Sequence, residues 1–144
     1  MAKTIIEFDL SGKPASVNGC KARKDSWKAQ VQSKVMALYT GGKNGEKFTV
    51  KIFYFPHNEQ YCDIDNGLKY TIDGMASDLM DNDKTVTRII TERFPKIPGA
   101  SLIVPLNIAP QIAQVIKQRE ISKSPVYLTL VKVEEYDYNG GSLW

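Results

Sequence analysis

The sequence predicts an α/β (α+β) fold, with one mixed β-sheet of about four strands, two main helices packed on it and a small inserted helix. Stretches rich in β-branched and aromatic residues alternate with segments of helical periodicity. The length of 144 residues suits one domain and is too short for two independent cores. Because 42% of the residues are hydrophobic and 24% charged, the chain can bury an ordinary globular core. We therefore expect a single domain over residues 1–144.

The first two elements are a strand and a helix. Residues 4–10 (TIIEFDL) are β-branched and aromatic and end at a Ser-Gly pair, which predicts a strand. Residues 26–39 carry apolar side chains at helical spacing, and Asp25 or Ser26 is available as the N-cap. The glycine pair that starts at Gly41 predicts where this helix stops.

The next two elements repeat that order. Residues 47–55 (KFTVKIFYF) place apolar residues at every second position and end at Pro56, which predicts a strand. The apolar residues of segment 66–79 recur at helical spacing and form one stripe, which predicts a helix. Asp65 is placed to cap the N-terminus of this helix.

The last third of the chain contains two further strands. Residues 85–93 (TVTRIITER) are β-branched and predict a strand, and residues 126–134 (VYLTLVKVE) predict another. A proline-rich segment between them encloses a short helix near residues 108–119. The tail, residues 136–144, has no partner element, so we expect it to be loose or to contact a partner.

Charge is distributed unevenly, although the net charge is only +3. A basic arm over residues 13–34 holds six cations against one acid, Asp25. Its cations are Lys13, Lys21, Arg23, Lys24, Lys28 and Lys34. An acidic segment over residues 59–83 holds seven carboxylates against one base, Lys69. Its acids are Glu59, Asp63, Asp65, Asp73, Asp78, Asp81 and Asp83. Like charges crowded in this way repel unless an opposite charge lies among them.

The acidic segment contains the candidate site. Asp63 and Asp65 point the same way if the chain is extended there, and Asp65, Lys69 and Asp73 follow at helical spacing along one flank. Asp83 opens the next strand. If that strand pairs beside the start of the helix, three carboxylates converge on one point.

Three converging carboxylates would need a cation to offset their repulsion. Oxygen ligands suit Mg²⁺ or Mn²⁺, which serve phosphoryl chemistry, and Lys69 is placed to meet a phosphate. In the alternative interpretation, Asp63 and Asp65 only cap the helix while Lys69 and Asp73 form an exposed pair. Spacing alone leaves both interpretations open.

The pattern Asp63-Ile64-Asp65-Asn66, then Lys69 and Asp73, then Asn82-Asp83 before a strand, resembles the RusA-type Holliday junction resolvase family. The loop Pro14-Ala15-Ser16-Val17-Asn18 also resembles the family's Pro-x-Ser-x-Asn loop. The resemblance runs from residue 4 to about 93 and resumes in the last strand. Three departures stand out: no arginine precedes Asp63, Asn82 stands where the family has an aspartate, and residues 94–124 form an insertion.

The resemblance implies a homodimeric, Mg²⁺-dependent endonuclease that cuts branched DNA in recombination and repair, in the style of phage or prophage enzymes. Asp63, Asp65 and Asp83 would hold Mg²⁺ (or Mn²⁺), Lys69 would stabilise the scissile phosphate, and Asp73 would orient Lys69. The expected DNA-binding residues are Ser16, Asn18, Lys21, Arg23, Lys24 and Lys28. A DNA-binding protein that no longer cuts, and a nuclease for flaps, are the alternatives.

The expected location is the cytoplasm of a bacterial or phage-infected cell, at the nucleoid. No apolar run reaches the about 18 residues that span a membrane. The N-terminus lacks a secretory pattern, so Cys20 and Cys62 are expected to be reduced thiols.

Overall fold

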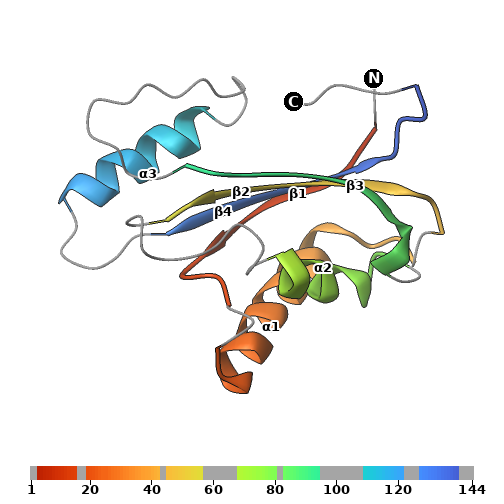
Figure 1. The fold of residues 1–144 in the computed structure, drawn as a ribbon, viewed down its shortest axis with the longest axis horizontal. Helices are drawn as coiled ribbons and strands as arrows, with labels where there is room; N and C mark the ends of the chain where they lie inside the picture. Colours follow the sequence, from red (N-terminus) through yellow and green to blue (C-terminus); the bar gives the residue numbers. More distant parts are fainter. Residues whose placement is uncertain are drawn as a thin grey trace.

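A computed structural model describes residues 3–15, 19–42, 45–56, 68–80, 83–94, 109–121 and 127–139. In these residues, four strands form one sheet in the order β1-β4-β2-β3, accompanied by three helices (Figure 1). The elements are β1 (Thr4–Ser11), α1 (Lys21–Leu38), β2 (Phe48–Phe55), α2 (Leu68–Ala76), a short 3₁₀ turn η1 (Asp83–Thr85), β3 (Val86–Arg93), α3 (Ala109–Ile121) and β4 (Leu128–Glu135). The predicted fold class, a single domain with a four-stranded mixed sheet and three helices, is confirmed, although the inserted helix α3 (13 residues) is longer than α2 (nine residues) and is not the small helix that the sequence predicts.

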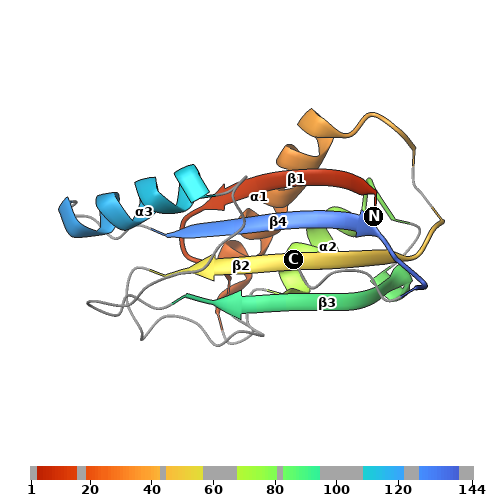
Figure 2. The same cartoon turned by 90° about the horizontal axis from the view of Figure 1, so that it is seen from above.

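The sheet contains both parallel and antiparallel pairs, and β4, the last strand in the sequence, lies between β1 and β2. β4 runs antiparallel to both β1 and β2, whereas β3 runs parallel to β2 through the crossover that contains α2 (Figure 2). β2 is buried along its whole length and β4 along most of it, while exposed residues recur along β1 and β3. β1 and β3 are therefore the edge strands.

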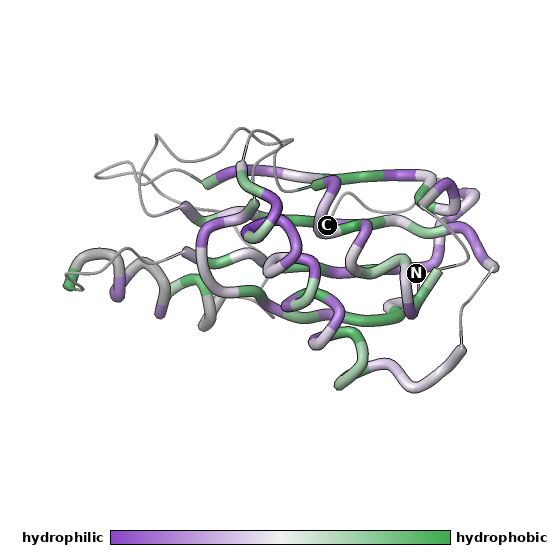
Figure 3. Tube along the Cα trace, turned by 90° about the horizontal axis from the view of Figure 1, so that it is seen from below, coloured by the Kyte–Doolittle hydropathy of each residue, from purple (hydrophilic) through white to green (hydrophobic). Residues whose placement is uncertain are grey.

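One face of the sheet is covered by α1 and α2. Trp27, Val31 and Val35 of α1 and Met75 of α2 are buried against side chains such as Ile52 of β2. Figure 3 shows hydrophobic residues along the strands, with hydrophilic ones interspersed along β3. This layer forms the main core of the described residues.

Two contacts hold α1 and α2 close together. The indole nitrogen Nε1 of Trp27 donates a hydrogen bond of 2.9 Å to the hydroxyl of Thr71, in a buried position. Gly74 lies so close to α1 that a Cβ atom there would be 2.8 Å from Cβ of Val31 and 3.0 Å from the carbonyl oxygen of Lys28. The glycine thus permits an approach between the helices that a side chain would prevent.

The opposite face carries α3 and a smaller apolar cluster. The cluster consists of Phe53, Phe55, Phe94, Ile112, Leu128 and Leu130. The rings of Phe55 and Phe94 are stacked with centroids 4.8 Å apart. On this same face, farther along β2 and β4, Lys51 forms a buried ion pair with Glu134.

The two main helices differ from prediction at their boundaries. α1 begins at Lys21, so Asp25 and Ser26 lie inside the helix and the predicted N-cap is wrong. Alanine, lysine and arginine are strong helix formers, which lets the helix continue back to Cys20, whose backbone is extended. At the end of α2, the hydroxyl of Ser77 donates to the carbonyl oxygen of Gly74 (3.1 Å), and residues 77–79 form a turn. The predicted Asp65 cap lies outside the described residues.

The first residues of the tail are attached to the sheet. The amide of Tyr136 donates to the carbonyl oxygen of Lys47 (2.9 Å), and its ring packs edge-on against Tyr138. Tyr136 is therefore attached to the sheet, and residues 140–144 of the predicted tail lie outside the described residues, so the prediction of a tail that is loose or contacts a partner stays a prediction. Within the described residues, no helix has both the length and the apolarity needed to cross a membrane.

Candidate functional site

The predicted site residues fall into three groups. Lys69 and Asp73 on α2, with the basic residues of α1, lie in the described part of the chain. For Asp83 the structure describes the backbone, which opens η1. Asp63, Asp65, Ser16 and Asn18 lie outside the described residues.

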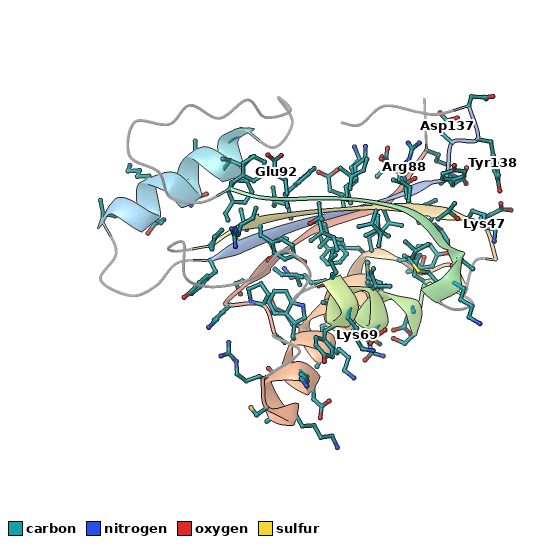
Figure 4. All side chains as sticks on the ribbon, viewed as in Figure 1. Lys47, Lys69, Arg88, Glu92, Asp137 and Tyr138 are labelled. Atoms are coloured by element: carbon teal, nitrogen blue, oxygen red, sulfur yellow. The ribbon has the colours of Figure 1, made fainter. Side chains whose placement is uncertain are left out.

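Lys69 occupies the first turn of α2 and is exposed. The next residue, Tyr70, is buried, and Thr71 is anchored to α1 through Trp27. The helix is thus held from its inner side while the lysine lies on the outer side, away from the sheet (Figure 4). A primary ammonium group in this position is accessible to a phosphate.

The basic end of α1 lies beside this first turn of α2. The ammonium group of Lys24 is 5.5 Å from the centroid of the Tyr70 ring, a cation–π contact between the two helices. Lys21, Lys24 and Lys28 share one stripe of α1, because residues three and four apart are neighbours on a helix. We call Lys21, Lys24, Lys28 and Lys69 the basic surface.

Two residues adjoin the basic surface. The guanidinium group of Arg23 donates to the carbonyl oxygen of Lys13 at 3.5 Å, which ties the preceding loop to the helix. Asp25 lies 3.9 Å from the ammonium group of Lys28, and both side chains remain partly exposed. One carboxylate therefore neutralises only part of this charge.

The start of α1 lacks a side-chain cap and carries cations at the positive end of the helix dipole. The side chain of Cys20 makes no capping hydrogen bond, and the first turn contains no acidic residue. Instead it contains Lys21, Arg23 and Lys24, although the positive end of the helix dipole disfavours cations. Amide groups at a helix start, together with cations, form an arrangement that attracts phosphate.

Asp73 lies one turn after Lys69 and is partly buried. No ion pair joins the two side chains in the structure, where the ion pairs among described residues involve other lysines. The role of Asp73 in orienting Lys69 therefore stays a prediction.

The backbone of Asp83 lies at the opposite end of α2 from Lys69. α2 has nine residues, which at about 1.5 Å per residue separates its two ends by more than ten ångströms. β3 begins after the C-terminal end of α2, as Figure 1 shows, and not beside its start. Within the described residues, no group of three or more His, Cys, Asp or Glu side chains is close enough to hold a metal ion.

Sequence analysis missed the contact between Lys24 and Tyr70. A lysine that follows a basic run and a tyrosine that follows Lys69 carry no local signal of a contact, because it depends on how the two helices cross. Trp27 and Phe53 are both buried and belong to the apolar clusters on the two faces of the sheet.

Comparison with known proteins gives one finding. The model of the family described as "Endodeoxyribonuclease RusA" matches residues 16–104, which is more than half of the chain. The match includes α1, β2, α2 and β3 and all predicted site residues, and it ends inside the predicted insertion, 94–124. No curated protein matches the chain.

Proposed function

The chain belongs to the RusA endodeoxyribonuclease family, and on that premise we propose that it is an Mg²⁺-dependent endonuclease that cuts four-way DNA junctions in recombination and repair. One observation carries the proposal: the basic surface joins Lys69 to the cations of α1 through the contact of Lys24 with Tyr70. Such a surface fits the phosphate backbone of DNA, whose contacts do not depend on base sequence.

The proposed metal ligands remain Asp63, Asp65 and Asp83, although the backbone of Asp83 lies at the end of α2 away from Lys69 and the other two residues lie outside the described part of the chain. Their donor atoms are all carboxylate oxygens, which suit Mg²⁺, with Mn²⁺ as a substitute. Lys69 lies four residues after Asp65 in the sequence and is exposed, so a phosphate near the carboxylates would be within its range. A bound Mg²⁺ would lower the pKa of a water molecule bound to it and would offset the negative charge of the phosphate.

The other residues act on the DNA itself. The ammonium group of Lys69 would bind an oxygen of the scissile phosphate and stabilise the negative charge that develops there. Asp73 would orient Lys69 when the phosphate is bound. Lys21, Lys24 and Lys28, with Arg23, would contact neighbouring phosphates, and Ser16 and Asn18 would contact the backbone from the preceding loop.

The proposed active form is a homodimer. A four-way junction presents two cleavable strands related by approximate two-fold symmetry. Two copies of one site, also related by two-fold symmetry, would match those strands. Symmetry therefore favours a dimer for this substrate over a monomer.

Cleavage and binding by three variants test the proposal. Asp65→Asn keeps the size and capping capacity of the side chain but removes a charge from the ligand set, so cleavage and Mg²⁺ affinity should collapse while binding without metal survives. Lys69→Ala should retain Mg²⁺ binding and lose cleavage. Asp78→Asn, in the turn after α2, is the matched control and should cut like the wild type.

The assay uses a labelled four-way junction, a flap and a linear duplex, with Mg²⁺ and then with EDTA, after circular dichroism has verified folding. Wild-type cleavage by folded Asp65→Asn would refute the metal assignment. Binding of the junction without any cleavage by the wild type would identify a DNA-binding protein that no longer cuts. Preferential cleavage of flaps would show that flap DNA, and not the four-way junction, is the substrate.

A further inference from the structure

The hydrogen bond between Trp27 and Thr71 is a directional contact between α1 and α2. Both side chains are buried, with 4% and 0% of their surface exposed, and the indole Nε1 lies 2.9 Å from the hydroxyl oxygen. A hydrogen bond weakens steeply when its length or angle changes, whereas apolar contacts are not directional. The bond therefore specifies one rotation of α2 about its own axis and one position of α2 along α1.

Two other contacts between the helices lack this directionality. The ammonium group of Lys24 lies 5.5 Å from the centroid of the Tyr70 ring, and a cation is attracted to the aromatic face as a whole. Gly74 lets α2 approach Val31 closely, but a glycine has no side chain that could fix the rotation of its helix. These contacts bring the helices near each other, and the buried hydrogen bond sets their relative orientation.

Lys69 lies on the side of α2 opposite to this hydrogen bond. With 3.6 residues per turn, side chains two residues apart are separated by about 200° around the helix axis. Lys69 is accordingly exposed, while Thr71 is fully buried against α1. A helix with its side chains is about 10–12 Å in diameter, so a rotation by about 20° moves a group at its surface by about 2 Å.

We propose that Trp27 and Thr71 are positioning residues for Lys69, because their hydrogen bond holds α2 in the rotation that directs the ammonium group to the scissile phosphate. The inference rests on the proposed function, in which Lys69 stabilises the developing charge. A misplacement of about 1 Å can lower the rate of a chemical step about 100-fold. The cations of α1 belong to the other helix, so the loss of this bond should slow cleavage and leave junction binding largely intact.

Cleavage kinetics on a four-way junction separate positioning from binding. Thr71→Val removes the hydroxyl and keeps the branched shape of the side chain, and Trp27→Phe removes the indole donor. Each variant should lower kcat about 10- to 100-fold and leave KM close to the wild-type value. Thr71→Ser retains a hydroxyl and should recover most of kcat. The double variant T71V/W27F should be no slower than the slower single variant, because both substitutions remove the same bond.

Val35→Ala is the matched control for a loss of stability. Val35 is a fully buried residue of α1 in the same apolar cluster, about two turns after Trp27. Its truncation should destabilise the fold without changing kcat, measured where circular dichroism shows every variant to be folded. An equal loss of kcat in Val35→Ala, wild-type kcat in both Thr71→Val and Trp27→Phe, or a raised KM with unchanged kcat would each overturn the positioning role.

Binding without metal keeps the inference testable apart from the nuclease assignment. If the wild type does not cut, the nuclease assignment fails, and junction affinity then tests the position of Lys69. Lys69→Ala should weaken binding by a larger factor in the wild-type background than in the Thr71→Val background, because a displaced lysine contributes less to the contact with phosphate. Equal factors in the two backgrounds would overturn the positioning role.

Discussion

The two faces of the sheet are stabilised in different ways. Among the described residues, the face under α1 and α2 is apolar, with eighteen residues in its core cluster. The face under α3 has a cluster of six, next to which the centre of the sheet carries the buried pair Lys51 and Glu134. The first face depends on close helix packing, whereas the second depends on a cluster at one end and an ion pair farther along.

The difference between the two faces coincides with the extent of the family match. α1 and α2 lie in the stretch that matches the family, while α3 lies beyond residue 104. Lys69 and the cations of α1 are carried by the two helices that cover the larger apolar cluster. Substitutions on the two faces should therefore have different consequences.

The largest effect is expected from breaking the ion pair. Lys51 is 3% exposed, and Lys51→Met leaves the carboxylate of Glu134 buried without its cation. Such a loss costs about 3–5 kcal/mol of the free energy of unfolding. Urea unfolding of this variant measures the cost.

The double variant Lys51→Met/Glu134→Leu is the matched control. Replacing both charges by apolar side chains of similar size should recover most of the lost stability, because neither charge is left unpaired. A single variant as stable as the wild type would show that the α3 face does not depend on the pair.

An intermediate effect is expected where the helices meet. Gly74→Ala places a Cβ atom 2.8 Å from Val31. Overpacking costs about 1–3 kcal/mol, and contacts of 2.8 and 3.0 Å, one of them to a backbone oxygen, place this site toward the upper part of that range, above the roughly 1 kcal/mol gained in helix propensity. We expect a lower free energy of unfolding and a weaker fluorescence signature of buried Trp27. Gly42→Ala, with nothing within 4 Å of its Cβ, should change stability by less than about 0.5 kcal/mol.

Local patterns predicted the elements well and their arrangement poorly. Every predicted helix and strand has its counterpart, because apolar periodicity is a local property of the chain. The position of β4 between β1 and β2 is not, since it depends on pairing between residues far apart in sequence. The start of α1 was missed because Asp25 and Ser26 look like caps, whereas residues 21–24 favour helix strongly enough to extend it.

The candidate site divides in the same way. Lys69 could be placed on the outer side of a helix from its spacing relative to the apolar residues. The contact of Lys24 with the neighbouring Tyr70 could not be predicted, because it depends on the close approach of α1 and α2 around Gly74. The position of Asp83 also required the structure, since the sequence does not say at which end of α2 the next strand begins.

The smallest effect on stability, and a clear effect on DNA binding, is expected at the start of α1. Lys21→Ala/Arg23→Ala removes two exposed cations from the positive end of the helix dipole. The free energy of unfolding should stay constant or rise by up to about 1 kcal/mol. If both cations contact phosphates, the slope of log K against log salt for a four-way junction should decrease in magnitude by about 2.

Lys34→Ala on the same helix is the matched control: it loses the ion pair with Asp9, worth about 0–1 kcal/mol, and should keep the wild-type slope. An unchanged slope in the double variant, measured from 50 to about 200 mM salt, would remove the start of α1 from the DNA-binding surface and leave Lys69 as its described member on α2.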